Sequence, residues 1–136
     1  MANWVTVSYA LTGEKAELLD IEKKIRLTEE DARNRMAETD GMGDVGYLAR
    51  QLGSELTYGD LGSYWSAAND DFDALSWRTT ADGEEYLHWI VKSKWCENPK
   101  MHEMIEGAYK TVKIYFKATS RDTDETNDKE GRYFVP

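Results

Sequence analysis

Residues 74–95 hold two runs of alternating apolar and polar side chains, and the dipeptide Asp82-Gly83 lies between them. An Asp-Gly pair between β-rich runs is a strong local signal for a β-hairpin. Because side chains alternate across a strand, the residues after this turn divide into two faces. One face has Leu87, Trp89, Val91, Ser93 and Trp95, and the other has Tyr86, His88, Ile90, Lys92 and Lys94. The sequence therefore predicts a central hairpin with a core face and a basic, aromatic face.

Strands are also predicted near both ends of the chain. Apolar residues alternate along two further runs, as Val5, Val7, Tyr9 and Leu11 in 3–11 and as Val112, Ile114, Phe116 and Ala118 in 111–118. The polar residues 119–131 are expected to form a flexible acidic loop, after which residues 132–135 return as a short edge strand.

Apolar side chains at helical spacing predict helices between these strands. The first predicted helix covers 14–25 and is capped by Thr12, and the second runs from a capping signal at Thr28 to about residue 37. The third covers 45–52 and is ended by Gly53. The fourth runs from Pro99 to about residue 108 and is capped by Asn98. Residues 54–70 contain glycines and aromatic residues without a sustained period. We expect a loop or irregular cap there, with room for one short strand.

The order of the predicted elements is βαββαβ, which in a small domain favours an antiparallel sheet with helices on one face. We therefore predict a single α+β domain over residues 1–136 with a ferredoxin-like sheet of four strands. The first crossover would contain a helical insertion at about residues 28–70.

Charge and cysteine content narrow the classes of function. The net charge of -9 and the pI near 4.7 argue against nonspecific nucleic-acid binding, which needs a dense cationic surface. Residues 84–117 nevertheless have six lysines against five glutamates, so this region has a balance of +1 and the remainder has -10. The one cysteine, Cys96, allows no internal disulfide, and no leader or apolar span is evident. We expect a cytoplasmic protein without a membrane role.

Several short motifs resemble those of a known family. Asn3-Trp4 opens the first strand, Ser93-Lys94-Trp95 is followed by Pro99, and the chain ends with YKTVKIYF and then GRYF. In these motifs the chain resembles the YubB-type ferredoxin-like domain of phage and plasmid proteins. The resemblance implies the ferredoxin-like fold and a phage or mobile-element setting, hence the host cytoplasm as location. It implies no catalytic residues.

The residues with chemical potential do not form a catalytic or metal motif. His88, Cys96 and His102 are too widely spaced for a Cys/His metal site. The pairs Asp70-Asp71 and Asp122/Asp124 are typical of solvated acidic loops. We therefore predict a protein that is not an enzyme and that uses no cofactor and no metal. The rival class is an enzyme whose site is completed across a subunit interface.

The second face of the predicted sheet is the candidate binding surface. Its predicted ligand-binding residues are Arg78, Tyr86, His88, Lys92, Lys94, Lys113, Tyr115 and Lys117, joined by Thr6 and Ser8. Basic side chains interleaved with aromatic rings suit a phosphate with a stacked base. An ordinary solvated sheet face and an oligomer interface are the alternatives.

Two roles follow for a small acidic protein of this kind. The first is an anti-defence factor that sequesters a small phosphorylated, nucleotide-type host signal on the basic face, with a homo-oligomer forming the pocket. The alternative is an acidic protein that inhibits a host defence protein by direct binding or by nucleic-acid mimicry, through residues 55–73 and 122–130.

Overall fold

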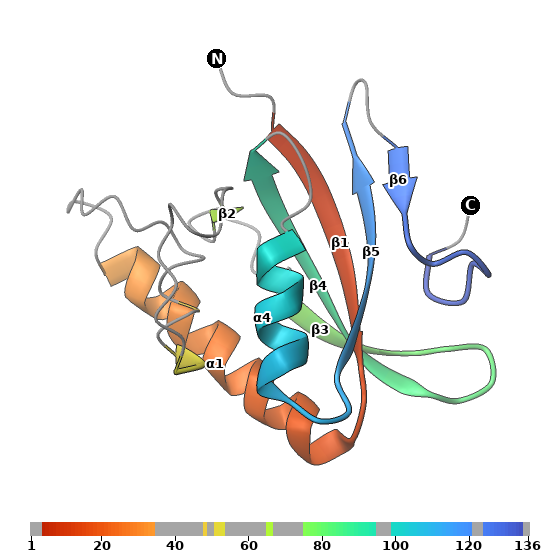
Figure 1. Ribbon diagram of the computed structural model, residues 1–136, viewed down its shortest axis with the longest axis horizontal. Coiled ribbons are helices and arrows are strands. Elements are labelled where there is room, and N and C mark those ends of the chain that lie inside the picture. Colours follow the sequence, from red (N-terminus) through yellow and green to blue (C-terminus); the bar gives the residue numbers. More distant parts are fainter. Residues whose placement is uncertain are drawn as a thin grey trace.

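The computed structural model describes residues 4–34, 48, 51–53, 65–66, 75–94, 99–120 and 124–134. These residues form an α+β structure in which two helices lie over one face of an antiparallel sheet (Figure 1). The elements are β1 (Trp4–Thr12), α1 (Lys15–Asn34), β2 (Trp65–Ser66), β3 (Leu75–Thr79), β4 (Glu85–Lys94), α4 (Pro99–Ala108), β5 (Lys113–Thr119) and β6 (Asp124–Thr126).

The sheet has the strand order β2-β4-β1-β5-β6, and β3 also pairs with β4. Strands β2 and β3 share one side of β4, because β2 pairs with residues 92–93 and β3 with residues 85–89. The sequence predicted a core of four strands and an edge strand at residues 132–135, and it left room for a short strand in 54–70. The structure has six among the described residues, since the segment before the hairpin and the segment after β5 each add a short strand.

The hairpin at Asp82-Gly83 is confirmed. The N–H of Thr80 donates to the carbonyl oxygen of Glu84 at 2.8 Å, and the N–H of Gly83 donates to the carbonyl oxygen of Thr80 at 3.0 Å. Gly83 has a φ of 91°, which a glycine adopts without steric cost. The turn therefore closes for the reason that the sequence indicated.

The core lies between the helices and the first face of the sheet. The strands contribute Val5, Val7, Tyr9, Leu11, Leu87, Trp89, Val91, Ile114 and Ala118 to it, and the helices contribute Leu18, Ile21, Ile25, Met101 and Ile105. The expected alternation of the strands and the expected apolar stripes of the two helices are thus both confirmed. Pro99 begins α4 as predicted.

Helix α1 is longer than the sequence predicted. It runs without interruption from Lys15 to Asn34, so Thr28 lies inside it and begins no second helix. No glycine or proline occurs between Gly13 and Gly41, and a capping residue alone does not stop a helix whose buried face continues. The predicted insertion therefore cannot begin at residue 28.

The start of α1 is capped from a distant part of the chain. The N–H of Glu14 donates to Oγ1 of Thr111 at 2.9 Å, and the N–H of Thr111 donates to Oε1 of Glu17 at 3.0 Å. The sequence predicts Thr12 as the cap. The loop before β5 supplies the hydroxyl instead, because Thr12 is still part of β1.

The predicted helix 45–52 lies mostly outside the described residues. Within them, Leu48 is buried in the core, and the N–H of Leu52 donates to the carbonyl oxygen of Leu48 at 3.0 Å. Gly53 has a φ of 74°, as expected for a glycine that ends a helix. In the segment 54–70, Trp65–Ser66 is the short strand for which the sequence left room.

The segment after β5 is more regular than the predicted loop. Residues 124–126 form β6, which pairs with β5 from Lys117↔Thr126 to Thr119↔Asp124. Residues 131–134 bend instead of forming the predicted edge strand. The reason is that the carboxylate of Asp128 accepts hydrogen bonds from the backbone N–H groups of residues 132–134. This bend turns the chain toward the β3–β4 hairpin (Figure 1).

Candidate functional site

The second face of the sheet carries the predicted binding residues in register. Ala10 of β1 is opposite His88 of β4 and also opposite Tyr115 of β5, so these three side chains share one face. Arg78 of β3 is opposite Tyr86, and Lys113 lies two residues before Tyr115. Tyr86 and Tyr115 are therefore flanked by a guanidinium on one side of the face and an ammonium on the other.

The C-terminal residues cover the middle of this face. The ring of Tyr133 lies 5.0 Å from the ring of Tyr86 at an interplanar angle of 73°, and 4.8 Å from the ring of Tyr115 at 34°. The ring of Phe134 lies 6.4 Å from that of His88. Tyr86 and Tyr115 thus form a slot, which we call the tyrosine slot, and Tyr133 occupies it.

Polar contacts to the β3–β4 hairpin hold the C-terminal residues in this position. The guanidinium of Arg132 pairs with the carboxylate of Asp82 at 3.0 Å and also with that of Glu84. The hydroxyl of Tyr133 donates to Oε1 of Glu84 at 3.3 Å. The hydrogen bond to Glu84 raises the pKa of Arg132, and burial followed by the charge of Glu84 raises the pKa of Tyr133.

Two side chains, those of Asn127 and Asp128, form the turn before Arg132 through hydrogen bonds with backbone groups. Asn127 accepts from the N–H of Phe116 at 2.7 Å and donates to the carbonyl oxygen of Ile114 at 3.0 Å, so it extends the β5 ladder. The carboxylate of buried Asp128 accepts from the N–H groups of residues 132, 133 and 134 at 2.9 to 3.0 Å. These contacts fix the path of the chain toward the tyrosine slot.

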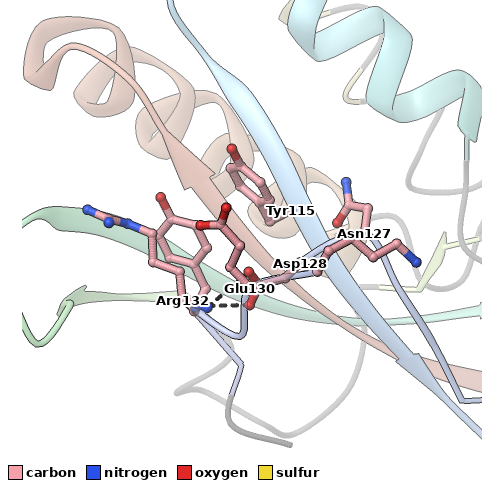
Figure 2. A pocket seen from close by; sticks show the side chains of 7 residues that line it. Tyr115, Asn127, Asp128, Glu130 and Arg132 are labelled. Carbon is pink, nitrogen blue, oxygen red and sulfur yellow. Dashed lines mark hydrogen bonds between the residues drawn. The ribbon is translucent and has the colours of Figure 1, made fainter.

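A cavity of about 220 Å³ adjoins the tyrosine slot (Figure 2). Its lining side chains are Tyr115, Asn127, Asp128, Lys129, Glu130, Arg132 and Tyr133. The volume is below the roughly 300 Å³ at which small-molecule pockets usually begin. The cavity alone can therefore hold only part of a nucleotide-sized ligand.

His88 lies beneath the C-terminal residues and is 4% exposed. Burial, with a smaller contribution from the charge of Arg78, lowers its pKa from 6.5 to about 4. Its Nδ1 has no hydrogen-bond partner among the described residues. At neutral pH this imidazole is uncharged.

The structure corrects the expectation that all the predicted residues project from an open face. Tyr86 and His88 are buried, because residues 133 and 134 pack on them. Arg78 and Lys113 are exposed, Tyr115 and Lys117 are half-buried, Thr6 is exposed and Ser8 is half-buried. The structure gives Lys92 and Lys94 by backbone only, in β4 opposite Thr6 and Trp4.

Four members of the site were not predicted from the sequence: Arg132, Tyr133, Asn127 and Asp128. The signal available for them was the pair Asn127-Asp128, two residues that favour turns through bonds from their side chains to the backbone, followed by the aromatic pair Tyr133-Phe134. That signal indicates a turn and does not say which surface the aromatic residues cover.

The second histidine lies on the opposite face of the sheet. Nε2 of His102 is 3.0 Å from the hydroxyl of Tyr9, and its ring packs against Tyr9 and Phe116. Burial lowers the pKa of His102 from 6.5 to about 4. Within the described ranges, no group of three or more His, Cys, Asp or Glu side chains could hold a metal ion.

No helix of the described part of the chain is long and apolar enough to cross a membrane. Comparison with protein-family models, with curated proteins and with solved structures gave no match for this chain.

Proposed function

We propose that this protein is a non-enzymatic binding protein that holds a small phosphorylated ligand of nucleotide type on the second face of its sheet. The observation that carries the proposal is the tyrosine slot, in which two rings from different strands hold a third ring between them. A planar base in the place of the Tyr133 ring would stack on Tyr115, which is inclined to that ring by 34°, and would contact Tyr86, which is inclined to it by 73°.

The chemistry of the slot suits both parts of a nucleotide. Stacking of a base on aromatic side chains contributes about 1–3 kcal/mol per base and is available to every base. Arg78 and Lys113 are exposed beside the slot, and no described carboxylate forms an ion pair with either. A guanidinium or an ammonium in that position can bind a phosphate group.

The groups around the slot favour binding over catalysis. Two phenols, a guanidinium, an ammonium, the neutral imidazole of His88 and the carboxylate of Glu84 surround it. An imidazole with a pKa of about 4 is a weak general base, because the best bases have pKa values near the working pH. We therefore assign no catalytic step to this face.

We further propose that the core of the fold is ferredoxin-like and that the role is sequestration. The order β3-β4-β1-β5 with antiparallel neighbours, and the two helices on one face, support the first point. The resemblance to a phage and plasmid domain family supports the role of sequestration. In this role the ligand is a host signal, and the protein is a cytoplasmic anti-defence factor that works as a homo-oligomer.

Calorimetric titration with a panel of mononucleotides and cyclic nucleotides tests the binding proposal. Arg78→Glu and Lys113→Glu should each weaken binding at least tenfold, since each replaces an attraction for phosphate by a repulsion. Lys23→Glu, an equal charge change on the exposed side of α1, is the matched control and should bind as the wild type does. Turnover of a nucleotide that His88→Ala abolishes would instead establish an enzyme.

The acidic surface supports a second candidate function. Asp82 and Glu85 at the hairpin, and Asp124 and Glu125 on β6, are all exposed carboxylates in a chain of net charge -9. An inhibitor of a host protein, or a mimic of nucleic acid, would present such a surface to a basic partner. Absence of heat with every nucleotide, together with salt-sensitive capture of one host protein that Asp124→Lys weakens, would favour this candidate.

A further inference from the structure

The C-terminal residues occupy the place that the proposed function gives to a base. The ring of Tyr133 lies within 5.0 Å of the rings of both Tyr86 and Tyr115, and its hydroxyl reaches the carboxylate of Glu84. A ligand base and Tyr133 cannot share this slot. Binding on the second face therefore requires that residues 132–134 leave it.

Residues 132–134 are held in part by surface ion pairs, which water can replace when the segment opens. The ion pairs of Arg132 with Asp82 and Glu84 lie at the surface, where all three side chains are more than a third exposed and the charges are screened by solvent. Residues 132–134 belong to no strand or helix. Opening this segment breaks the three hydrogen bonds from its N–H groups to Asp128 but no ladder of the sheet, so it costs less than unfolding the domain.

The surface beneath the segment has an unused polar atom. Nδ1 of His88 is buried without a hydrogen-bond partner in the described part of the chain, and a buried polar atom in that state is unfavourable. Ser76 of β3 and Ala10 of β1 are its neighbours in register, and both are small. A ligand that replaces Phe134 above the ring of His88 could bring a polar group to this atom.

We propose that residues 132–134 are an internal stand-in for the ligand, and that a nucleotide binds by displacing them from the tyrosine slot. This inference rests on the proposed function. The base takes the place of the Tyr133 ring, and an N–H at its edge donates to Glu84 where the Tyr133 hydroxyl donates now. The ligand class is thus a nucleobase with an N–H donor edge, joined to a phosphate that reaches Arg78 or Lys113.

Competition of this kind makes a definite prediction about affinity. If only a fraction of the molecules has the slot open, the apparent dissociation constant is raised by the inverse of that fraction. A variant that loosens the segment without touching the slot should therefore bind more tightly. Arg132→Gln is such a variant, because it removes both ion pairs and leaves Tyr86, Tyr115 and Glu84 in place.

The experiment combines calorimetry with amide hydrogen exchange on the full chain. The probe is guanosine 5′-monophosphate, since guanine presents two N–H donors on one edge. Lys23→Gln is the matched control, because it removes the same charge from an exposed side chain of α1 that lines no part of the site. Tyr133→Ser, which empties the slot directly, is the second variant.

We expect at least fivefold tighter binding by Arg132→Gln and Tyr133→Ser than by the wild type or by Lys23→Gln. Nucleotide added to the wild type should also accelerate exchange of the amides of residues 132–134, whose N–H groups are bound by Asp128 in the closed state. Binding that leaves these amides protected, or that is no tighter in the loosened variants, would overturn the inference and leave the proposed function standing. If no chain binds a nucleotide although exchange shows the segment open in Arg132→Gln, both are overturned.

Discussion

The carbonyl oxygen of Thr111 lies against Gly13 so closely that a Cβ at residue 13 would be 2.9 Å from it. Gly13 also has a φ of 146°, which side chains rarely allow. We expect Gly13→Ala to lower the free energy of unfolding by about 1–3 kcal/mol, from strain in the backbone and from the clash.

Gly107→Ala is the matched control, because Gly107 lies in α4 with open space around it. It should raise the free energy of unfolding by roughly 0.5–1 kcal/mol, since alanine favours a helix over glycine. Urea unfolding measures both. Equal effects of the two substitutions would contradict the close approach of residues 13 and 111.

The distant cap of α1 gives a second prediction. Thr111→Ala removes the hydroxyl that accepts from the N–H of Glu14 and should lower the free energy of unfolding by about 1 kcal/mol. Thr111→Ser keeps the hydroxyl and should retain most of the stability. Thr79→Ala, at an exposed site, controls for the loss of a threonine. A cap supplied by Thr12 would instead leave Thr111→Ala without effect.

The carboxylate of Asp128 should control the C-terminal turn locally. Asp128→Asn replaces a charged acceptor of three N–H groups by a neutral one with a single acceptor oxygen. We expect the opening free energy of the amides of residues 132–134 to fall by roughly 1–3 kcal/mol. The amides of β1 should exchange as before, and Asp124→Asn on exposed β6 should change neither set.

Stability should decrease in mild acid because of the two histidines. Burial lowers the pKa values of both His88 and His102 from 6.5 to about 4. Between these values the unfolded chain binds protons that the folded chain does not, so the free energy of unfolding falls as the pH falls through this window. For His88 alone the loss at about pH 4 is on the order of 3 kcal/mol.

Urea unfolding at about pH 7 and about pH 5 checks this dependence. His88→Leu places an apolar side chain of similar size beside Phe134. It should remove the contribution of His88 to the pH dependence of the free energy of unfolding, while the contribution of His102 remains. Identical free energies of unfolding at the two pH values in the wild type would show that neither histidine is buried in its neutral form.

The sequence predicted the parts of the fold that local patterns determine. The turn at Asp82-Gly83, the start of α4 at Pro99 and the buried parity of β1, β4 and β5 depend on neighbouring residues, and all were confirmed. The continuity of α1 past Thr28 was not predicted, because a capping residue has no power to end a helix that tertiary contacts support.

The candidate site was predicted in part, for a related reason. Alternation placed Arg78, Tyr86, His88 and Tyr115 on one face, as the register shows. It could not show that this face is covered, because Arg132 contacts Asp82 across 50 residues of sequence. Alternation describes which side of the sheet a residue takes. Contacts between distant segments decide whether that side is open.

Intermolecular nuclear Overhauser effects between a bound nucleotide and the ring protons of Tyr86 and Tyr115 test the tyrosine slot most directly. We predict effects from the base protons to both rings, accompanied by loss of the effects between Tyr133 and these rings. Effects from the nucleotide to other parts of the chain, with the Tyr133 contacts unchanged, would contradict binding in the slot.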